Sequence, residues 1–467
     1  MKHVFKKALA LSMALMMVLT VSVFAADVPV ISPAPASAIS VVLDGKPINF
    51  TDVTPELIND RTYVPFRAVF EALGATVDYQ NDARTIIAKL DGKTVEFKIG
   101  SSEVKVTENG VTTVVKTDAA SFIDAKSDRT LVPVRFAAQS LGSTVGWSQN
   151  TKTVNIIDGS KLMNTYAGKF SLMDRYLASN AAQSKKTLAF SGTLKMSMQM
   201  TQDGQTMPFG VSGTVNGVTS PESVEMAAKL AMDLSALTAD MTAEEKAQME
   251  ALKNIDANYI INMKTGMMYL NMPMMHTVNP SIPENAWFFI DISEMYRSML
   301  GINLDFAALV NMNTNSAKFA DSLQMILPMM ADEDGAYENI AEAFKLCEKM
   351  FGDNAFTKSG STYTSSVTTE EQGAKITMKM TLTESGKDIT GATMNITASQ
   401  NGMNMTMESS YNSSKSTAKV TMDVPNMFKL DCNVDMNFSE TTKTPAKQPA
   451  SNVTLINFMD MMNSLNP

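Results

Sequence analysis

One stretch of this chain occurs twice, and it constrains the fold more than any other feature. Residues 60–67 read DRTYVPFR and residues 128–135 read DRTLVPVR. The copies stay in register over 60–85 and 128–153, with Tyr79 corresponding to Trp147. A repeat of this length is a structural unit used twice. It therefore indicates an architecture, and it contains no set of residues typical of catalysis.

Each copy predicts a strand–helix–strand unit. Pro65 and Pro133 stand where a helix begins, a position at which the missing N–H costs nothing. Apolar residues then follow at helical spacing until Gly74 and Gly142, which supply the left-handed residue that ends a helix. Alternating segments separated by Asp91-Gly92 and Asn109-Gly110 predict hairpins. We expect this repeat domain to span residues 39–158.

Two arginines recur at the same position of the repeat, Arg67 and Arg135. One interpretation is a binding site for an anion or a wall polymer. The other is that they pair with Asp60 and Asp128, or with backbone carbonyls, and so stabilise the loop before each helix. We favour the second, because an arginine repeated with the fold usually serves the fold.

The doubled pattern RT-x-VP-x-R followed by LG-[AS]-x-V, closing on Trp147, resembles the copper amine oxidase N-terminal domain. That family implies a small α+β stalk domain on secreted bacterial proteins, without the oxidase chemistry. The copper enzyme needs three His ligands, whereas this chain has two His, His3 and His276. We expect no amine oxidase activity, no metal site and no cofactor.

The first 25 residues predict a secretory signal peptide. A lysine-containing start precedes an apolar run, and Val23-Phe24-Ala25 offers small residues for cleavage. No later stretch predicts a transmembrane segment, so the mature protein is expected outside the cytoplasm. The net charge of −9 argues against binding to a nucleic acid backbone.

The second half is rich in methionine, since 35 of the 39 methionines lie after residue 160. They alternate with Lys, Thr, Ser and Asn, which places them on one face of strands. The pattern predicts a large antiparallel sheet with one apolar face. Helical segments at 161–185 and within 293–351 would cover it, which makes the fold class α+β.

This half resembles, in pattern over residues 163–438, the bacterial lipoprotein carriers. The shared features are a leading helix, long methionine-alternating strands, and the segments MYLNMP at 268–273 and AWFFIDIS at 286–293. The resemblance implies a half-barrel sheet around a hydrophobic cavity. The chain departs from it in having no Cys for lipid attachment and in the helical insertion.

Three interpretations of the methionines are open: a plain core, an adaptable cavity for lipid-like ligands, or Cu(I) binding by Met-x-Met runs. The residues predicted to line a cavity are Met196, Met198, Met200, Met378, Met380, Met403, Met405 and Met407.

The remaining features concern the cysteines and the C-terminal end. Cys347 and Cys432 both lie on apolar faces, so either a disulfide or two buried thiols is expected. We expect the methionine-rich domain to span 161–438. Residues 439–453 have the composition of a linker, and 454–467 form a short amphipathic segment expected to dock on the sheet.

No nucleophile–base pair or phosphate-binding loop is recognisable, so no catalytic residue is assigned. The sequence favours a non-enzymatic cell-envelope protein that binds a lipid-like ligand in its second domain, with the first as a positioning module. The alternative is a surface interaction protein without a small ligand. Ligand identity and oligomeric state stay open.

Overall fold

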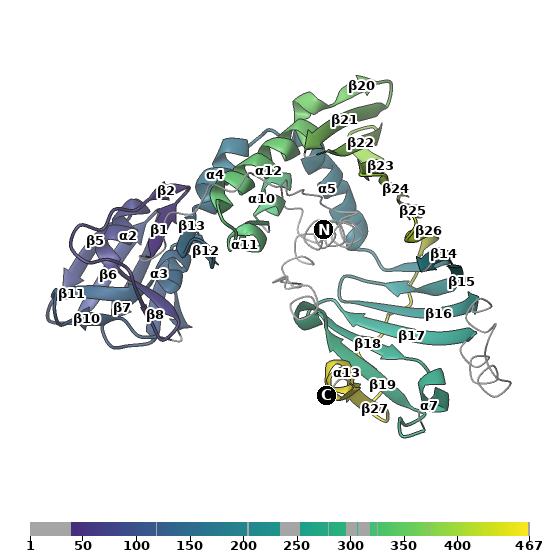
Figure 1. The fold of residues 1–467 in the computed structure, drawn as a ribbon, viewed down its shortest axis with the longest axis horizontal. Coiled ribbons are helices and arrows are strands. Elements are labelled where there is room, and N and C mark those ends of the chain that lie inside the picture. Colours follow the sequence, from purple (N-terminus) through teal and green to yellow (C-terminus); the bar gives the residue numbers. More distant parts are fainter. Residues whose placement is uncertain are drawn as a thin grey trace. The chain divides into compact units, whose positions relative to one another are not determined.

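The computed structural model describes residues 39–117, 119–202, 205–233, 253–278, 280–295, 306, 318–324, 326–371 and 373–465 (Figure 1). The predicted signal peptide and part of the 293–351 helical block lie outside these residues. Contacts divide the chain into two units. The repeat unit is the described part of Val23–Ala167 together with Ala320–Leu346, and the sheet unit is Gly168–Phe319 with Cys347–Pro467. This division differs from the continuous 161–438 domain expected from the sequence.

The two copies of the repeat form the predicted strand–helix–strand units. The first consists of β4 (Arg61–Pro65), α2 (Phe66–Ala72), β5 (Thr76–Gln80) and β6 (Thr85–Leu90). The second consists of β11 (Arg129–Pro133), α3 (Val134–Ser140), β12 (Thr144–Ser148) and β13 (Thr153–Ile157). Pro65 and Pro133 precede the helices, and Gly74 and Gly142 follow them with φ of +89° and +96°. The helix-ending role predicted for both glycines is therefore observed.

The two copies meet across a local two-fold axis. Strands β4 and β11 pair antiparallel, with Val64 opposite Val132, the equivalent position of the other copy. Both valines are fully buried. Each copy therefore contributes the same strand to the contact, as in a symmetric dimer interface. The two buried valines place part of the core at the junction between the copies.

Three small sheets complete the repeat unit. The first copy extends into a five-stranded sheet through β7 (Lys93–Lys98), β8 (Glu103–Glu108) and β9 (Val111–Lys116). In the second copy, β13 instead pairs in parallel with β1 (Ser40–Leu43), which pairs with β2 (Lys46–Pro47). The third sheet has the order β10-β11-β4-β3, with β10 at Phe122–Asp124 and β3 at Glu56–Ile58.

Residues 331–335 lie against strands β12 and β13. Asn155 donates from Nδ2 to the carbonyl oxygen of Ala331 at 2.9 Å. The Asp334 carboxylate accepts hydrogen bonds from Ser148, Asn150 and Thr151, of which the bond from Ser148 contributes most to lowering the pKa of Asp334. These bonds tie an insertion from the second half of the sequence to the repeat unit.

The sheet unit is built on one sheet of 14 strands, in the order β20-β21-β22-β23-β24-β25-β26-β14-β15-β16-β17-β18-β19-β27. All neighbours are antiparallel except β19 and β27. The bounds are β14 Leu188–Gln202, β15 Gln205–Thr219, β16 Ser223–Asp233, β17 Asn254–Asn262, β18 Met267–Asn271, β19 Ala286–Asp291, β20 Thr357–Ser359, β21 Thr362–Glu371, β22 Ala374–Ser385, β23 Asp388–Gln400, β24 Met403–Asn412, β25 Lys415–Val424, β26 Phe428–Glu440 and β27 Thr454–Asn457.

The predicted class α+β holds only coarsely. Strands contain 52% of the residues and helices 20%, so the protein is mostly β. The difference arises because each methionine-rich segment forms a long hairpin strand, whereas the described helices are short. Besides α2 and α3 these are α4 Gly159–Tyr166, α5 Ser171–Ser184, α7 Met274–Val278, α10 Phe319–Leu323, α11 Ile326–Met330, α12 Ala336–Phe351 and α13 Phe458–Leu465. No helix within the described ranges has both the length and the apolar character needed to cross a membrane.

The helix predicted over residues 161–185 is two helices. It breaks between α4 and α5, where Gly168 has a φ of +73° and the division between the two units falls. The second helix then begins with its N–H groups bonded to another segment, because the Asp353 carboxylate accepts from the amides of Ser171 and Leu172 at 3.0 and 2.9 Å. A carboxylate at this position satisfies N–H groups that have no partner within the helix.

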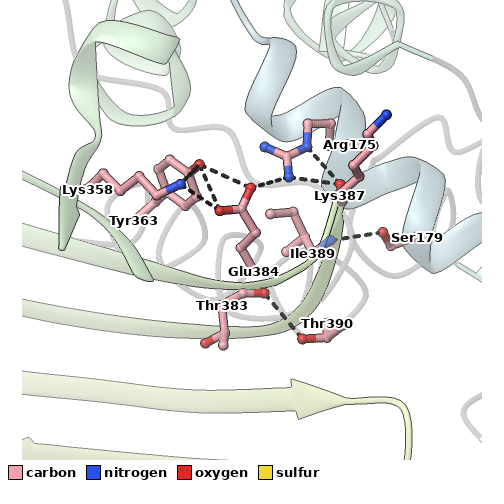
Figure 2. Close-up of polar contacts among 9 residues, drawn as sticks. All are labelled: Arg175, Ser179, Lys358, Tyr363, Thr383, Glu384, Lys387, Ile389 and Thr390. Atoms are coloured by element: carbon pink, nitrogen blue, oxygen red, sulfur yellow. Dashed lines mark hydrogen bonds and ion pairs between the residues drawn. The ribbon is translucent and has the colours of Figure 1, made fainter. Parts of the chain in front are cut away.

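A cluster of charged residues attaches α5 to the hairpin of β22 and β23 (Figure 2). Glu384 accepts hydrogen bonds from Arg175 at 2.5 Å and from Lys358 at 2.7 Å. Tyr363 also donates to Glu384, at 3.2 Å. Hydrogen bonds from Lys358 and then Arg175 lower the pKa of Glu384 to about 2. The Glu384 side chain is only 16% exposed, whereas Arg175 and Lys358 are 35% and 51% exposed, so a shielded carboxylate links the helix, the hairpin and β20.

We expect this cluster to make the sheet unit sensitive to acid. The pKa of Glu384 is lower in the folded chain, about 2, than its ordinary value of 4.5. Its contribution is therefore fully present above about pH 4.5 and is lost as the pH falls towards 2. The expected result is that Glu384→Gln lowers the melting temperature at pH 7 and that the difference from wild type shrinks below pH 4.5. A difference that stays constant from pH 7 to pH 3 would contradict this assignment.

The C-terminal residues contact the sheet at several points. Within the segment predicted as a linker, Pro445 accepts a hydrogen bond from Ser223 at 3.2 Å, and Lys447 forms an ion pair with Glu222. The chain then forms β27 and α13, where Phe458 packs edge-on against Phe288 of β19. The predicted linker is therefore bonded to the sheet, and the last segment docks on it.

Candidate functional site

The methionines of the sheet unit lie on one face, which we call the methionine face. Paired positions form a continuous apolar row across nine strands, from β21 to β16: Val367, Met378, Ile396, Met407, Val420, Cys432, Met196, Val211 and Met232. The neighbouring residues Lys195, Ser197 and Lys379 are exposed on the opposite face. The alternation in the sequence thus becomes a surface that crosses most of the sheet.

Burial changes along this face. On β22 to β24 it is a closed core, with Met378, Ile396 and Met407 at 2%, 1% and 5% exposure. There α5 packs on β23, and Ser179 of α5 accepts a hydrogen bond from the amide of Ile389. On β25, β26, β14 and β15 the same rows are only partly buried among the described residues, and Met200 reaches 48% exposure.

The eight methionines predicted to line a cavity therefore share a face but differ in environment. Met378, Met380, Met405 and Met407 are buried on β22 and β24. Met196, Met198 and Met403 are partly buried, and Met200 is exposed. Met200 lies opposite Phe428 and Met207, and Met198 lies opposite Leu430 and Phe209. The partly buried half is the candidate site.

The arginine pairing predicted for the repeats is wrong. Arg67 forms an ion pair with Glu71, four residues later on α2, at 3.3 Å. Among the described residues Arg135 has no hydrogen-bond or ion-pair partner, and it is exposed. Asp60 and Asp128 instead have φ of +60° and +55° and serve as turn residues, because Asp tolerates the left-handed region better than most side chains.

The two cysteines are free thiols, so the disulfide considered from the sequence is not formed. Cys347 is buried on α12, and burial raises the pKa of its thiol to about 12. Cys432 lies in the middle of the sheet, between Val420 and Met196. Each thiol fills space as a small apolar group in its own environment, which was the alternative interpretation.

His276 lies on α7 and its Nδ1 atom is 2.7 Å from the carbonyl oxygen of Ile282. Across the described ranges, His, Cys, Asp and Glu form no group of three or more that could hold a metal ion. Cu(I) binding by the Met-x-Met runs is not tested by this arrangement and stays a prediction of the sequence.

We expect the natively purified protein to contain no stoichiometric copper and to lack amine oxidase activity. The physical reason is that three imidazole ligands cannot come from a chain with two histidines. Elemental analysis and peroxide release from a primary amine are the measurements. One copper per chain, or peroxide formation above a heat-inactivated control, would show that the expectation is wrong.

The repeat unit is similar to a known domain family. Residues 42–156 and 109–173 match the copper amine oxidase N-terminal domain. The match agrees with the resemblance found in the doubled motif, and it covers the repeat and the start of the next segment. No curated protein matches the sequence.

Two solved structures align with the chain over about the same share of its length. A DUF1329 family protein from Desulfovibrio piger aligns at 7% identity and a TM-score of 0.20, covering 59% of this chain and 95% of that one. MucB in complex with MucA aligns at 6% identity and a TM-score of 0.09, covering 60% and 94%. TM-scores this low carry no weight for fold or function.

Sequence patterns did not reveal two arrangements. The Glu384 cluster joins α5 to β20 and β22, and its outermost members, Arg175 and Glu384, are 209 positions apart. The Asp334 contacts join β12 to a segment beyond residue 330. The acidic run Asp332-Glu333-Asp334 was the only available signal, and it is equally typical of an exposed loop.

Proposed function

We propose that this protein is a non-enzymatic protein of the bacterial cell envelope that binds a lipid-like ligand. The binding surface is the partly buried half of the methionine face, and the repeat unit serves as a positioning module. One observation carries the proposal: the same apolar rows that are buried on β22, β23 and β24 continue onto β25, β26, β14 and β15 with partial exposure.

The chemistry of this surface favours an apolar ligand of variable shape. Met198, Leu430, Phe209 and Met422 are neighbours on it, and the charged side chains next to them in sequence, Lys429, Asp431 and Asp423, lie on the opposite face. Large contiguous apolar surfaces on a soluble protein usually mark a binding site. Unbranched thioether side chains adjust to different hydrocarbon shapes at little cost, which suits an acyl chain better than a rigid ligand.

A location outside the cytoplasm is supported by two independent features. The first 25 residues have the pattern of a secretory signal, and the repeat unit matches a domain family of stalk type. The resemblance described above associates that family with secreted bacterial proteins. The location belongs to the proposal on these grounds.

The proposal does not include catalysis, because no nucleophile–base pair is recognisable in the sequence. The carboxyls with strongly shifted pKa values are Glu384 and Glu222, both lowered to about 2 by hydrogen bonds from lysine or arginine. Carboxylates held ionised in this way are poor proton carriers near neutral pH. They instead connect segments of the sheet unit.

The test compares two adjacent residues of β14 that lie on opposite faces. Met198→Lys places a charge on the proposed binding surface, whereas Ser197→Lys places the same charge on the exposed polar face. We expect wild type and Ser197→Lys to bind 1-anilinonaphthalene-8-sulfonate saturably and to release it to oleate. Met198→Lys should lose at least about tenfold in affinity, equivalent to about 1.4 kcal/mol.

Met198→Leu conserves volume and should keep dye binding, which separates loss of the fold from loss of the surface. Far-UV circular dichroism establishes that each variant is folded. Equal binding by Met198→Lys and Ser197→Lys, or a wild-type protein that binds neither dye nor oleate, would reject the lipid-like ligand. The interaction protein without a small ligand would then be the better description.

A further inference from the structure

The two copies of the repeat differ in what surrounds their shared arginine. In the first copy, Glu71 neutralises Arg67, and the guanidinium also lies 5.7 Å from the centre of the Phe66 ring. In the second copy the equivalent residues are Gln139 and Val134. Arg135 therefore has neither the carboxylate nor the aromatic ring that its counterpart has. The fold keeps the arginine in both places. Within the part of the chain that the structure describes, Arg67 is paired and Arg135 is not.

Arg135 lines a groove within the repeat unit. The groove has a volume of about 960 Å³ and lies between the start of α3, the β3 edge, the turn at Asp60 and strand β12. All of these elements belong to one unit, so the groove is a property of a single folded body. Its size suits a ligand of several rings rather than a single small ion.

The groove combines positive charge with an aromatic ring. Arg61, Arg135 and Lys152 line it together with two carboxylates, Glu56 and Asp60, which leaves one net positive charge in a chain of net charge −9. Trp147 also lines it, at the position that Tyr79 occupies in the first copy. Its indole N–H donates to Gln149 at 2.8 Å, which orients the ring. Leu57, 56% exposed, adds apolar surface at the β3 edge.

We propose that this groove binds an anionic saccharide chain, with an acidic group at Arg135 and a sugar ring against Trp147. A guanidinium binds carboxylate or phosphate through two parallel hydrogen bonds, and an unpaired exposed arginine keeps those donors free. The indole offers a flat apolar surface to the C–H face of a pyranose. Gln149, Glu56 and Asp60 supply acceptors and donors for hydroxyl groups, as binding sites for polar ligands require. The site is independent of the methionine face.

The experiment measures binding of defined probes to the full chain by titration calorimetry. The probes are a tetragalacturonate, its methyl ester, which lacks the negative charges, and inorganic phosphate. We expect tetragalacturonate to bind, and the ester and phosphate to bind at least tenfold more weakly. Arg135→Ala and Trp147→Leu should each lower the tetragalacturonate affinity at least tenfold, while the matched variant Arg67→Ala should leave it unchanged.

A second pair of variants tests the asymmetry itself. Gln139→Glu gives Arg135 the carboxylate that Arg67 already has, so it should weaken tetragalacturonate binding without a change in melting temperature. Glu71→Gln makes the reverse change in the first copy and should not affect binding. Dye binding to the methionine face should be the same in all of these variants.

Three results would overturn the proposal. The first is no tetragalacturonate binding by the wild type. The second is equal loss of affinity in Arg67→Ala and Arg135→Ala, which would show a general effect of charge. The third is binding of phosphate as tight as that of the saccharide, which would show a simple anion site without a role for Trp147.

Discussion

Replacing Met378 with lysine is expected to unfold the sheet unit. Met378 is 2% exposed on β22, between Val367 of β21 and Ile396 of β23. An ammonium group there would have no charged partner on the apolar face and no access to water. We expect a loss of more than about 4 kcal/mol, a large part of the roughly 5–15 kcal/mol that stabilises a typical protein.

The control for this prediction is Met378→Leu, which conserves volume and should cost less than about 1.5 kcal/mol. Urea denaturation followed by circular dichroism measures both. The contrast with Met198 is part of the prediction, because the same lysine on the partly buried half should affect ligand binding more than folding. A Met378→Lys protein with the wild-type transition midpoint would mean that the covered half of the methionine face is open to solvent.

The second large effect is expected at Gly146 in β12. A Cβ atom at this position would lie 2.1 Å from the backbone carbon and oxygen of Ala331. Backbone atoms cannot move aside as a flexible side chain does, so Gly146→Val should separate residues 331–335 from the strand. The hydrogen bonds of Asp334 and Asn155 would be lost with them. We expect a loss of about 2–4 kcal/mol from overpacking and the broken bonds.

The repeat provides a matched control for Gly146. The equivalent residue of the first copy is Asp78, which is exposed on β5. Asp78→Val should therefore change stability by less than about 0.5 kcal/mol. Thermal unfolding gives the stabilities, and amide hydrogen exchange at residues 331–335 reports the contact directly. Unchanged exchange in Gly146→Val would show that the insertion does not depend on this strand.

The methionine pattern shows how far local sequence information reaches. Strict alternation in segments such as 194–200, 376–382 and 403–407 determines which side chains share a face, because successive residues of a strand point to opposite sides. That prediction needed no knowledge of strand order, and the pairing confirms it. Whether a methionine on that face is buried depends on what packs above it. Met378 and Met198 have the same pattern and different environments, so the pattern alone could not separate them.

The arginines show the opposite case. Their recurrence correctly indicated a repeated structural position, but their partners depend on a residue one helical turn away. Glu71 pairs with Arg67 at a spacing that sequence reasoning can recognise on a helix, and Gln139 at the same spacing cannot pair with Arg135 in that way. The groove beside Arg135 forms because β3, β12 and α3 come together in the fold. The sequence of any one of these segments does not predict that contact.

The sequence by itself determined the doubled strand–helix–strand unit, the turns at Gly74 and Gly142, and the single apolar face of the methionine-rich strands. These features follow from periodicity and from the conformational preferences of Gly, Pro and Asp, which act within a few residues. The tertiary structure decided the break at Gly168, the packing of residues 320–346 with the repeat unit, the free state of Cys347 and Cys432, and the burial of each methionine. Those outcomes depend on contacts between residues far apart in the chain, whose energies appear only once the elements have come together.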